Sequence, residues 1–311
     1  MIVLLGKKLE KGDTIGIVSP SSSEEPKKIK ESIKFLESLG FNVKSGKHIY
    51  DRWGYLAGKD KDRVQDLMDM FLDKEVDIIL CIRGGYGAMR LLPLIDFDII
   101  EKSPKIFAGF SDITTLLNSI YQRCNLITFH SPMCNSQFDS STLKSFLNTL
   151  MFGYNPFTIE NTNNIPTNYF NGEYVKGELV GGNLSLICST LGTPYAINTK
   201  DKILFIEEVE EEPYKIDRML THLSLSGSLQ QCRGFIIGQF KDCEFSQYEK
   251  SLTLSEIFED RILSLRKPTL TNFQSGHSYP KITIPIGAEV EIDLKNGKIH
   301  LLKPVVKSND S

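Results

Sequence analysis

The chain has 311 residues, of which 41% are hydrophobic and 24% are charged, and its formal net charge at pH 7 is −3. These values are ordinary for a globular protein with one large or two medium domains. The slightly acidic balance gives no support for a nucleic acid or a membrane surface as a partner. The apolar run at residues 1–5 is too short for a signal peptide, and no stretch approaches the ~20 apolar residues of a membrane span. We therefore expect a cytoplasmic protein.

The six cysteines favour the same compartment. They stand at positions 81, 124, 134, 188, 232 and 243 and form no C-x-x-C pair. A chain of this length does not need disulfides to hold its core together. We expect buried, reduced thiols.

The first half of the chain alternates strand and helix patterns. Strands are expected at 14–19, 41–43, 76–82, 105–110 and 125–129, and helices at 24–39, 60–73, 112–121 and 140–151. The segment 76–82 (VDIILCI) is almost continuously hydrophobic, which is typical of a strand buried on both faces of a parallel sheet. This alternation predicts an α/β fold with right-handed crossovers and a doubly wound sheet.

Residues 153–173 interrupt this alternation. They are rich in Asn, Pro and Gly and show little periodicity. We therefore predict an N-terminal domain at 1–152, a linker at 153–173 and a C-terminal domain at 174–311. In the second half, strands are expected at 175–180, 202–209, 234–239 and 268–273, a β-rich stretch at 282–292, and helices at 184–191, 213–225 and 254–265.

Candidate chemistry lies at the carboxyl ends of the predicted strands, where open α/β sheets place their sites. Ser111 follows the strand at 105–110, so its hydroxyl could project from a tight turn as a nucleophile does. The alternative is that Ser111 or Asp112 caps the next helix. The loop 83–87 (RGGYG) has three glycines in four positions, which suits close backbone approach to an oxyanion or phosphate, or an ordinary turn.

Two further strand ends carry acid–base side chains. Glu207 and Glu208 end an apolar run, where a carboxylate needs a partner. The alternative role is a favourable charge before the helix that follows. His277 lies beside a glycine after the strand at 268–273, in a loop that suits a general base or a surface residue. His130, which ends another strand, suits a structural turn, and no Cys/His spacing indicates a metal.

Together these segments resemble the LD-carboxypeptidase family, the S66 serine peptidases. The matching stretches are GDTIGIVSPSS at 12–22, IRGGYGAMRLLPLID at 82–96, AGFSDIT at 108–114, GELVGGNLSLICSTLGTPY at 177–195, LFIEEVEEEPYKIDRMLTHL at 204–223 and GHSYPKITIPIGAEV at 276–290. The resemblance implies a flavodoxin-like N-terminal domain, similar to class I glutamine amidotransferases, and a smaller swivelling α/β domain. It also implies a homodimer and no cofactor.

The resemblance further implies the catalytic residues. Ser111 matches the family's nucleophile, Glu207 its acidic residue and His277 its base. The backbone N–H groups of Asp112 and Gly85 match the oxyanion hole.

The implied substrate is a small peptide, the murein tetrapeptide, cut before its terminal D-alanine during peptidoglycan recycling. Arg83 is a candidate clamp for the free carboxylate of that substrate, and Gly84 and Tyr86 beside it are further candidate substrate-binding residues. Two alternatives stay open at this point. One is a microcin C-type self-immunity amidase that cleaves peptide–nucleotide conjugates. The other is a non-catalytic module that binds phosphate or carboxylate.

Overall fold

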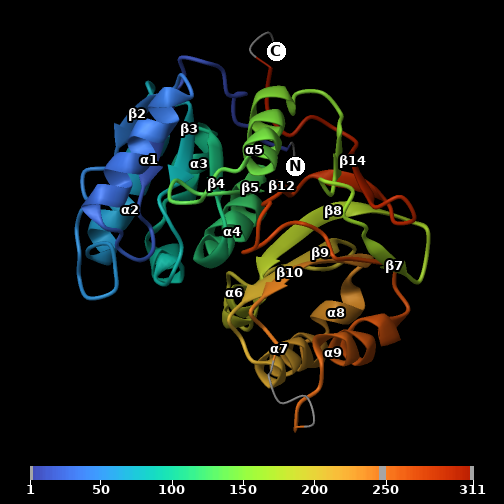
Figure 1. The fold of residues 1–311 in the computed structure, drawn as a ribbon. Coiled ribbons are helices and arrows are strands. Elements are labelled where there is room, and N and C mark those ends of the chain that lie inside the picture. Colours follow the sequence, from blue (N-terminus) through green and yellow to red (C-terminus); the bar gives the residue numbers. More distant parts are fainter. Residues whose placement is uncertain (1–2, 245–249, 309–311) are drawn as a thin grey trace. The chain divides into compact units, whose positions relative to one another are not determined.

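The computed structural model describes residues 3–244 and 250–308 and divides the chain into two compact units (Figure 1). The first unit runs to Asn155 and also takes in Thr283–Gly287 and the C-terminal segment from Pro304. The second unit comprises Pro156–Ile282 and Ala288–Lys303. The division after residue 155 falls near the start of the predicted linker, but the C-terminal part of the chain is shared between both units.

The first unit is built on a sheet with strand order β12-β5-β4-β3-β1-β2. Its strands are β1 (Thr14–Val18), β2 (Asn42–Ser45), β3 (Ile78–Cys81), β4 (Ile106–Gly109), β5 (Thr128–His130) and β12 (Ile284–Ile286). The strands β1 to β5 are parallel, and β12 adds to β5 in the antiparallel sense. The order 2-1-3-4-5 is that of flavodoxin-like folds, so the predicted fold class is confirmed. All residues of the central strands β3 and β4 are buried.

Helices cover both faces of this sheet. They are α1 (Pro26–Ser38), α2 (Asp60–Leu72), α3 (Phe97–Lys102), α4 (Thr114–Cys124) and α5 (Ser140–Phe152), with short 3₁₀ helices η1 (Ala88–Leu94) and η2 (Ser111–Ile113). The helices α2, α3 and α4 pack side by side, and α1 and α5 approach each other through the rings of Phe35, Phe138 and Phe146 (Figure 1). Asp139 caps α5 by accepting from the N–H groups of Ser141 and Thr142.

The second unit is built on a mixed sheet with strand order β6-β14-β13-β8-β9-β10-β11-β7. Its strands are β6 (Thr158–Glu160), β7 (Asn168–Phe170), β8 (Tyr174–Asn183), β9 (Ile203–Val209), β10 (Gly234–Lys241), β11 (Thr269–Thr271), β13 (Glu289–Asp293) and β14 (Lys298–Leu301). The strands β8 to β11 are parallel and the remaining pairings are antiparallel.

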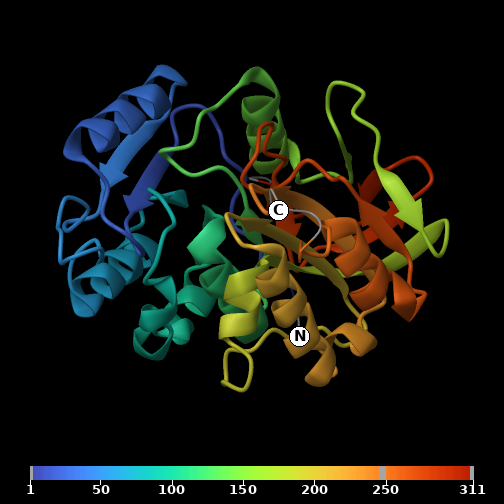
Figure 2. The same ribbon diagram turned by 60° about the horizontal axis from the view of Figure 1, so that its bottom comes forward.

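Helices of the second unit gather on one face of its sheet. They are α6 (Leu184–Ser189), α7 (Pro213–Leu225), α8 (Ser228–Gln231) and α9 (Leu254–Arg261), followed by the 3₁₀ helix η4 (Leu263–Leu265). Figures 1 and 2 show these helices, coloured yellow to orange, together on the same side. In the part of the chain that the structure describes, no helix is long and apolar enough to cross a membrane.

The segment 153–173 differs from the expected linker. It contributes β6 and β7, which form the two edges of the second sheet. All three residues of β7 are exposed, and in β6 only Ile159 is buried, opposite Ile299 of β14. Edge strands of this kind carry little hydrophobic alternation, so the sequence pattern misses them.

The six cysteines are all free. Five are buried, and Cys188 is partly exposed. Burial raises the pKa of the Cys124 and Cys188 thiols to about 12, which leaves both groups protonated and unreactive at neutral pH. The prediction of unpaired thiols is therefore confirmed.

Candidate active site

In the first unit, three neighbouring strands deliver the predicted site residues to one edge of the sheet. The strands β1, β3 and β4 are adjacent and parallel, so their carboxyl ends meet. Ser21 and Ser22 follow β1, the RGGYG loop follows β3, and Ser111 follows β4. This edge lies at the β1/β3 switch point of the strand order, where open α/β sheets bind ligands.

Ser111 has an unusual backbone conformation. Its φ is +62°, in the left-handed region that non-glycine residues seldom adopt, at a cost of about 1–3 kcal/mol. The capping positions of η2 and α4 are Phe110 and Ile113, and neither helix receives a side-chain cap. Ser111 is therefore not there as an N-cap. A strained serine between a strand and a helix is the arrangement by which nucleophile elbows expose their hydroxyl.

The Asp112 carboxylate fastens the loops around Ser111. It is 1% exposed and accepts hydrogen bonds from Ser21 Oγ at 2.6 Å and from the N–H of Ala88 at 2.8 Å. Burial raises the pKa of Asp112, against the opposing effects of these two donors and of the nearby Arg63 guanidinium. One carboxylate thus joins the loops after β1, β3 and β4, a role that the sequence pattern did not reveal.

The RGGYG loop packs directly against the Ser111 turn. A Cβ atom on Gly84 would lie 2.9 Å from Ser111 Cβ and 3.3 Å from the backbone nitrogen of Asp112. A Cβ atom on Gly85, whose φ is +111°, would lie 2.4 Å from Ser22 Oγ. Only glycine allows this approach. The predicted oxyanion donors, the N–H groups of Gly85 and Asp112, therefore belong to loops in mutual contact.

Arg83 and Tyr86 border this loop with different partners. The Arg83 side chain is 36% exposed, and its Nη1 lies 3.6 Å from Glu24 Oε2. Burial opposes ionisation of Glu24, yet hydrogen bonds from Glu25 N and Asn135, together with Arg83, lower the pKa of its carboxyl. Tyr86 is 45% exposed, and its N–H donates to Ser22 Oγ. The Arg83 guanidinium therefore forms a long ion pair with Glu24 and remains partly exposed, so it could also bind the carboxylate of a ligand.

In the second unit, the buried Glu207 pairs with the partly exposed His277. Glu207 lies near the end of β9 and is fully buried, and its Oε2 is 2.6 Å from His277 Nδ1. The His277 side chain is 15% exposed. A carboxylate on Nδ1 orients the imidazole and leaves Nε2 as the nitrogen available for proton transfer. A Cβ on Gly276 would lie 3.0 Å from Glu207 Oε2, so the glycine before His277 allows the loop to approach the carboxylate.

Glu208 points to the opposite side of β9, as successive strand residues do. Its carboxylate accepts from Asn183 Nδ2 at 2.7 Å, from Ser185 N at 2.8 Å and from Ser185 Oγ at 2.7 Å. Burial raises the pKa of Glu208, these donors oppose the rise, and the charge of Glu207 adds to it. Glu208 therefore holds the start of α6, and Glu207 is the member of the acidic pair that faces the histidine.

Two residues that the sequence analysis missed hold the His277 loop. Gln239, at the exposed end of β10, accepts from Ser278 N at 3.0 Å and donates to Pro280 O at 3.2 Å. Lys281 donates to Gly276 O at 2.8 Å. The signal in the sequence is weak: a glutamine ends the apolar run 234–239, and a lysine directly precedes the β-rich stretch 282–292.

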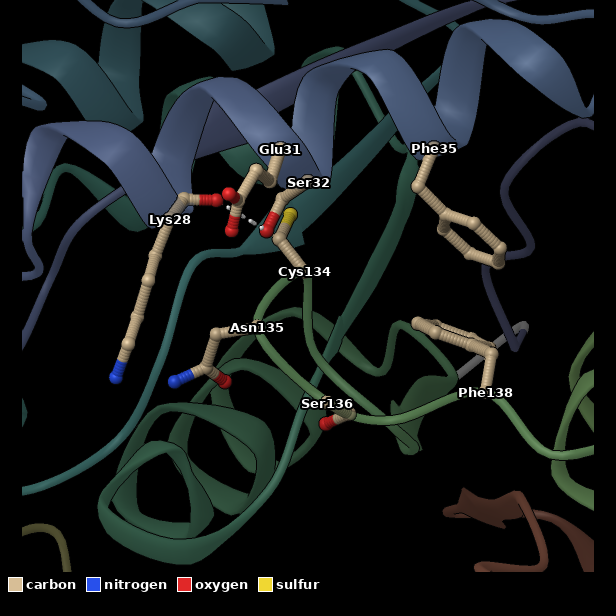
Figure 3. Close-up of a pocket in the computed structure, with 8 residues that line it drawn as sticks. All are labelled: Lys28, Glu31, Ser32, Phe35, Cys134, Asn135, Ser136 and Phe138. Carbon is tan, nitrogen blue, oxygen red and sulfur yellow. Dashed lines mark hydrogen bonds between the residues drawn. The ribbon is translucent and has the colours of Figure 1, made fainter.

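His130 and a cavity beside α1 contribute no predicted site residue to these clusters. His130 is buried edge-on against the Phe110 ring, as expected for a structural residue. A cavity of about 330 Å³ lies between α1 and the loop after β5 (Figure 3). Its Phe35 and Phe138 rings lie 5.1 Å apart, and no predicted site residue lines it. Within the described ranges, no group of three or more His, Cys, Asp or Glu residues is placed to hold a metal.

A strained serine on a flavodoxin-like sheet and a histidine paired with a buried glutamate on a second α/β unit are the residue types from which serine hydrolases build their catalytic sites. Residues 15–131 match the LD-carboxypeptidase N-terminal domain, and residues 176–292 match the LD-carboxypeptidase C-terminal domain. A probable murein peptide carboxypeptidase of Bacillus subtilis (strain 168) is 44% identical over 92% of this chain and 91% of its own length.

Solved structures agree with the sequence relatives. The structure of MccF in complex with glutamyl sulfamoyl guanosine matches with a TM-score of 0.90 at 25% identity, covering 98% of this chain and 100% of that one. A muramoyltetrapeptide carboxypeptidase from Oxalobacter formigenes matches with a TM-score of 0.81 at 29% identity, covering 93% and 97%. The chain belongs to the LD-carboxypeptidase family. It is a serine-type carboxypeptidase, and the non-catalytic alternative is set aside.

Proposed function

We propose that this enzyme removes the terminal D-alanine from murein tetrapeptides by cutting the amide bond that follows the L-centre of a diamino acid. The proposal is supported by the 44% identity to a probable murein peptide carboxypeptidase and by the match to a muramoyltetrapeptide carboxypeptidase. The observation that carries the mechanism is the 2.6 Å contact between the buried Glu207 carboxylate and His277 Nδ1.

In the proposed reaction, Ser111 Oγ attacks the amide carbonyl while His277 Nε2 takes its proton. Glu207 accepts from Nδ1–H and stabilises the imidazolium that forms. The oxyanion is held by the backbone N–H groups of Asp112 and Gly85. His277 then protonates the leaving nitrogen, which releases D-alanine. Water, activated by the same histidine, hydrolyses the acyl-enzyme and frees the tripeptide.

An exopeptidase of this kind also has to recognise the free carboxylate of its substrate. Arg83, next to Gly84 and Tyr86, borders the loop that supplies one oxyanion donor. Its guanidinium is partly exposed, and its ion pair with Glu24 is 3.6 Å long. A guanidinium holds a carboxylate best in a short bidentate pair. We therefore propose Arg83 as the group that binds the D-alanine carboxylate.

The adjacent glutamates provide a matched test of the mechanism. Glu207→Gln should lower kcat by about 10²- to 10⁴-fold, because the amide cannot balance the charge of the imidazolium. Glu208→Gln alters a carboxylate of similar burial that faces Asn183 and Ser185, so its main effect should be on stability. Equal losses of kcat in both variants would contradict the assignment of Glu207.

A cytoplasmic role in peptidoglycan recycling and a homodimeric state complete the proposal. Light scattering coupled to size-exclusion chromatography tests the dimer. A mass that corresponds to 35.1 kDa would identify a monomer and contradict it.

A second candidate substrate is favoured by the structural match to MccF, which includes complexes with aminoacyl sulfamoyl nucleosides. The same residues would then cleave an amide in a peptide–nucleotide conjugate. The enzyme should be offered murein tetrapeptide and aspartyl sulfamoyl adenosine under the same conditions. Faster cleavage of the tetrapeptide supports the carboxypeptidase, and faster cleavage of the nucleoside conjugate supports the immunity-type activity.

A further inference from the structure

Lys281 places a buried ammonium group next to the loop that carries His277. The residue is 5% exposed. Its Nζ donates to the carbonyl oxygen of Gly276 at 2.8 Å and lies 4.7 Å from the centroid of the Tyr279 ring. Gly276 is the residue immediately before His277, so this hydrogen bond acts directly on the backbone that positions the imidazole.

A buried ammonium is costly unless an opposite charge lies close to it. The charged groups that act on Lys281 are Glu207 on β9, which attracts it, and Lys241 on β10, which repels it. Burial lowers the pKa of Lys281 to about 8, with Glu207 opposing this change. The Glu207 carboxylate therefore has two neighbours, the His277 ring at 2.6 Å and the Lys281 ammonium, whose charge it attracts.

Two side chains bind the backbone of the loop that carries His277, and only one of them, Lys281, is charged. Gln239 binds the backbone at Ser278 and Pro280 through neutral hydrogen bonds. Lys281 binds the backbone at Gly276 with an ammonium. A Cβ on Gly276 would lie 3.0 Å from Glu207 Oε2, so the carbonyl that Lys281 binds belongs to a residue next to the proposed catalytic carboxylate.

We propose that Lys281 is a positioning residue of the Glu207–His277 pair: its ammonium fixes the Gly276 carbonyl and offsets the charge of Glu207, so that His277 stays unprotonated and able to act as a base at neutral pH. This inference rests on the proposed function, since it takes Glu207 and His277 as the catalytic pair.

The proposal has a signature that a purely structural role lacks. Without the ammonium, the uncompensated Glu207 charge makes the pair bind a proton more tightly. The acid limb of the kcat/KM profile then moves to higher pH, by on the order of one unit for the loss of a buried charge that interacts with Glu207. A structural defect would lower kcat/KM by the same factor at every pH.

The experiment compares the wild type with Lys281→Met, Lys281→Gln, Lys281→Arg and the neutral control Gln239→Ala. In the Met and Gln variants, the loss of kcat/KM at about pH 6 should be roughly tenfold greater than at about pH 8.5. The Arg variant, which keeps the charge, should retain the acid limb of the wild type. Gln239→Ala should lower activity without moving the limb. An unmoved acid limb in both neutral variants would overturn the proposal.

A second readout separates this inference from the choice of substrate. NMR titration of the His277 imidazole, assigned with His277→Ala, needs no turnover. Its midpoint should rise by on the order of one pH unit in Lys281→Met and stay near the wild-type value in Gln239→Ala. A midpoint that does not move in Lys281→Met overturns the role of Lys281, whereas a shifted midpoint in an enzyme inactive on tetrapeptide overturns only the proposed substrate.

Discussion

Replacement of Lys281 by methionine should change the pH dependence of stability. The ammonium is buried, and its pKa falls from the ordinary value of 10.5 to about 8 in the folded protein. Below about pH 8 the folded state therefore holds a proton that the environment disfavours. Methionine keeps most of the side-chain length and removes the titrating group.

The size of the effect on stability follows from the difference between the pKa of Lys281 in the folded and in the unfolded protein. A fall of about 2.5 pKa units corresponds to about 3 kcal/mol against the folded wild type at neutral pH. Since the unfolded chain binds more protons than the folded chain between about pH 8 and 10.5, wild-type stability rises with pH in this window. Between about pH 7 and 9.5 the gain from this residue is about 2 kcal/mol.

The assay is urea unfolding of the wild type and Lys281→Met, followed by circular dichroism at several pH values. Subtraction of the two curves removes groups that titrate equally in both proteins. The free energy of unfolding of the wild type, relative to that of Lys281→Met, should rise by about 2 kcal/mol as the pH rises from about 7 to 9.5. A difference that is flat with pH, or that shifts in favour of the variant, would refute the description of Lys281 as a buried, destabilised ammonium.

Three further predictions concern other residues of the two clusters. Gly84→Ala should lower kcat by about tenfold or more, with a smaller effect on overall folding measured by circular dichroism, because the new Cβ would lie 2.9 Å from Ser111 Cβ; unchanged turnover would contradict the close packing of the loop. Glu208→Ala should destabilise the fold by about 2–4 kcal/mol in urea unfolding, because Ser185 and its neighbours lose a buried acceptor; a loss below about 0.5 kcal/mol would contradict this. Arg83→Ala should raise KM for murein tetrapeptide about tenfold while leaving KM for the C-terminal carboxamide unchanged; equal changes for both peptides would remove the carboxylate clamp.

The interior elements of both units are predictable from the sequence, because burial leaves a clear hydrophobic pattern. The helix Pro213–Leu225 has the predicted bounds, and its proline occupies the first turn. The central strand β9 begins one residue after the predicted start, and six of its seven residues are buried. Patterns of this kind are local, so a single sequence is enough to detect them.

The features that were not predicted are pairings between distant segments of the chain. The strand β12 lies in the predicted C-terminal domain yet pairs with β5 of the first unit. The strand β7 has no buried residue, and its pairing with β11 alone defines it. No local pattern encodes these pairings, because they depend on contacts between residues more than 90 positions apart.

The candidate site shows the same division. The residue types at the strand ends indicated Ser111, Glu207 and His277 as separate candidates. The family resemblance predicted that the three form one catalytic triad. Three features were not predictable from the sequence. They are the left-handed backbone of Ser111, the hydrogen bonds by which Asp112 links three loops, and the hydrogen bond from Lys281 to the Gly276 carbonyl. Each depends on geometry that arises only after the sheets have formed.

The most direct test of the account is release of D-alanine from L-Ala-γ-D-Glu-meso-diaminopimelate-D-Ala, followed by mass spectrometry with the wild type, Ser111→Ala and His277→Ala. The account predicts release by the wild type and a loss of several orders of magnitude in each variant. Equal release by the wild type and Ser111→Ala would contradict the assignment of the nucleophile, and no release by the wild type would contradict the proposed substrate.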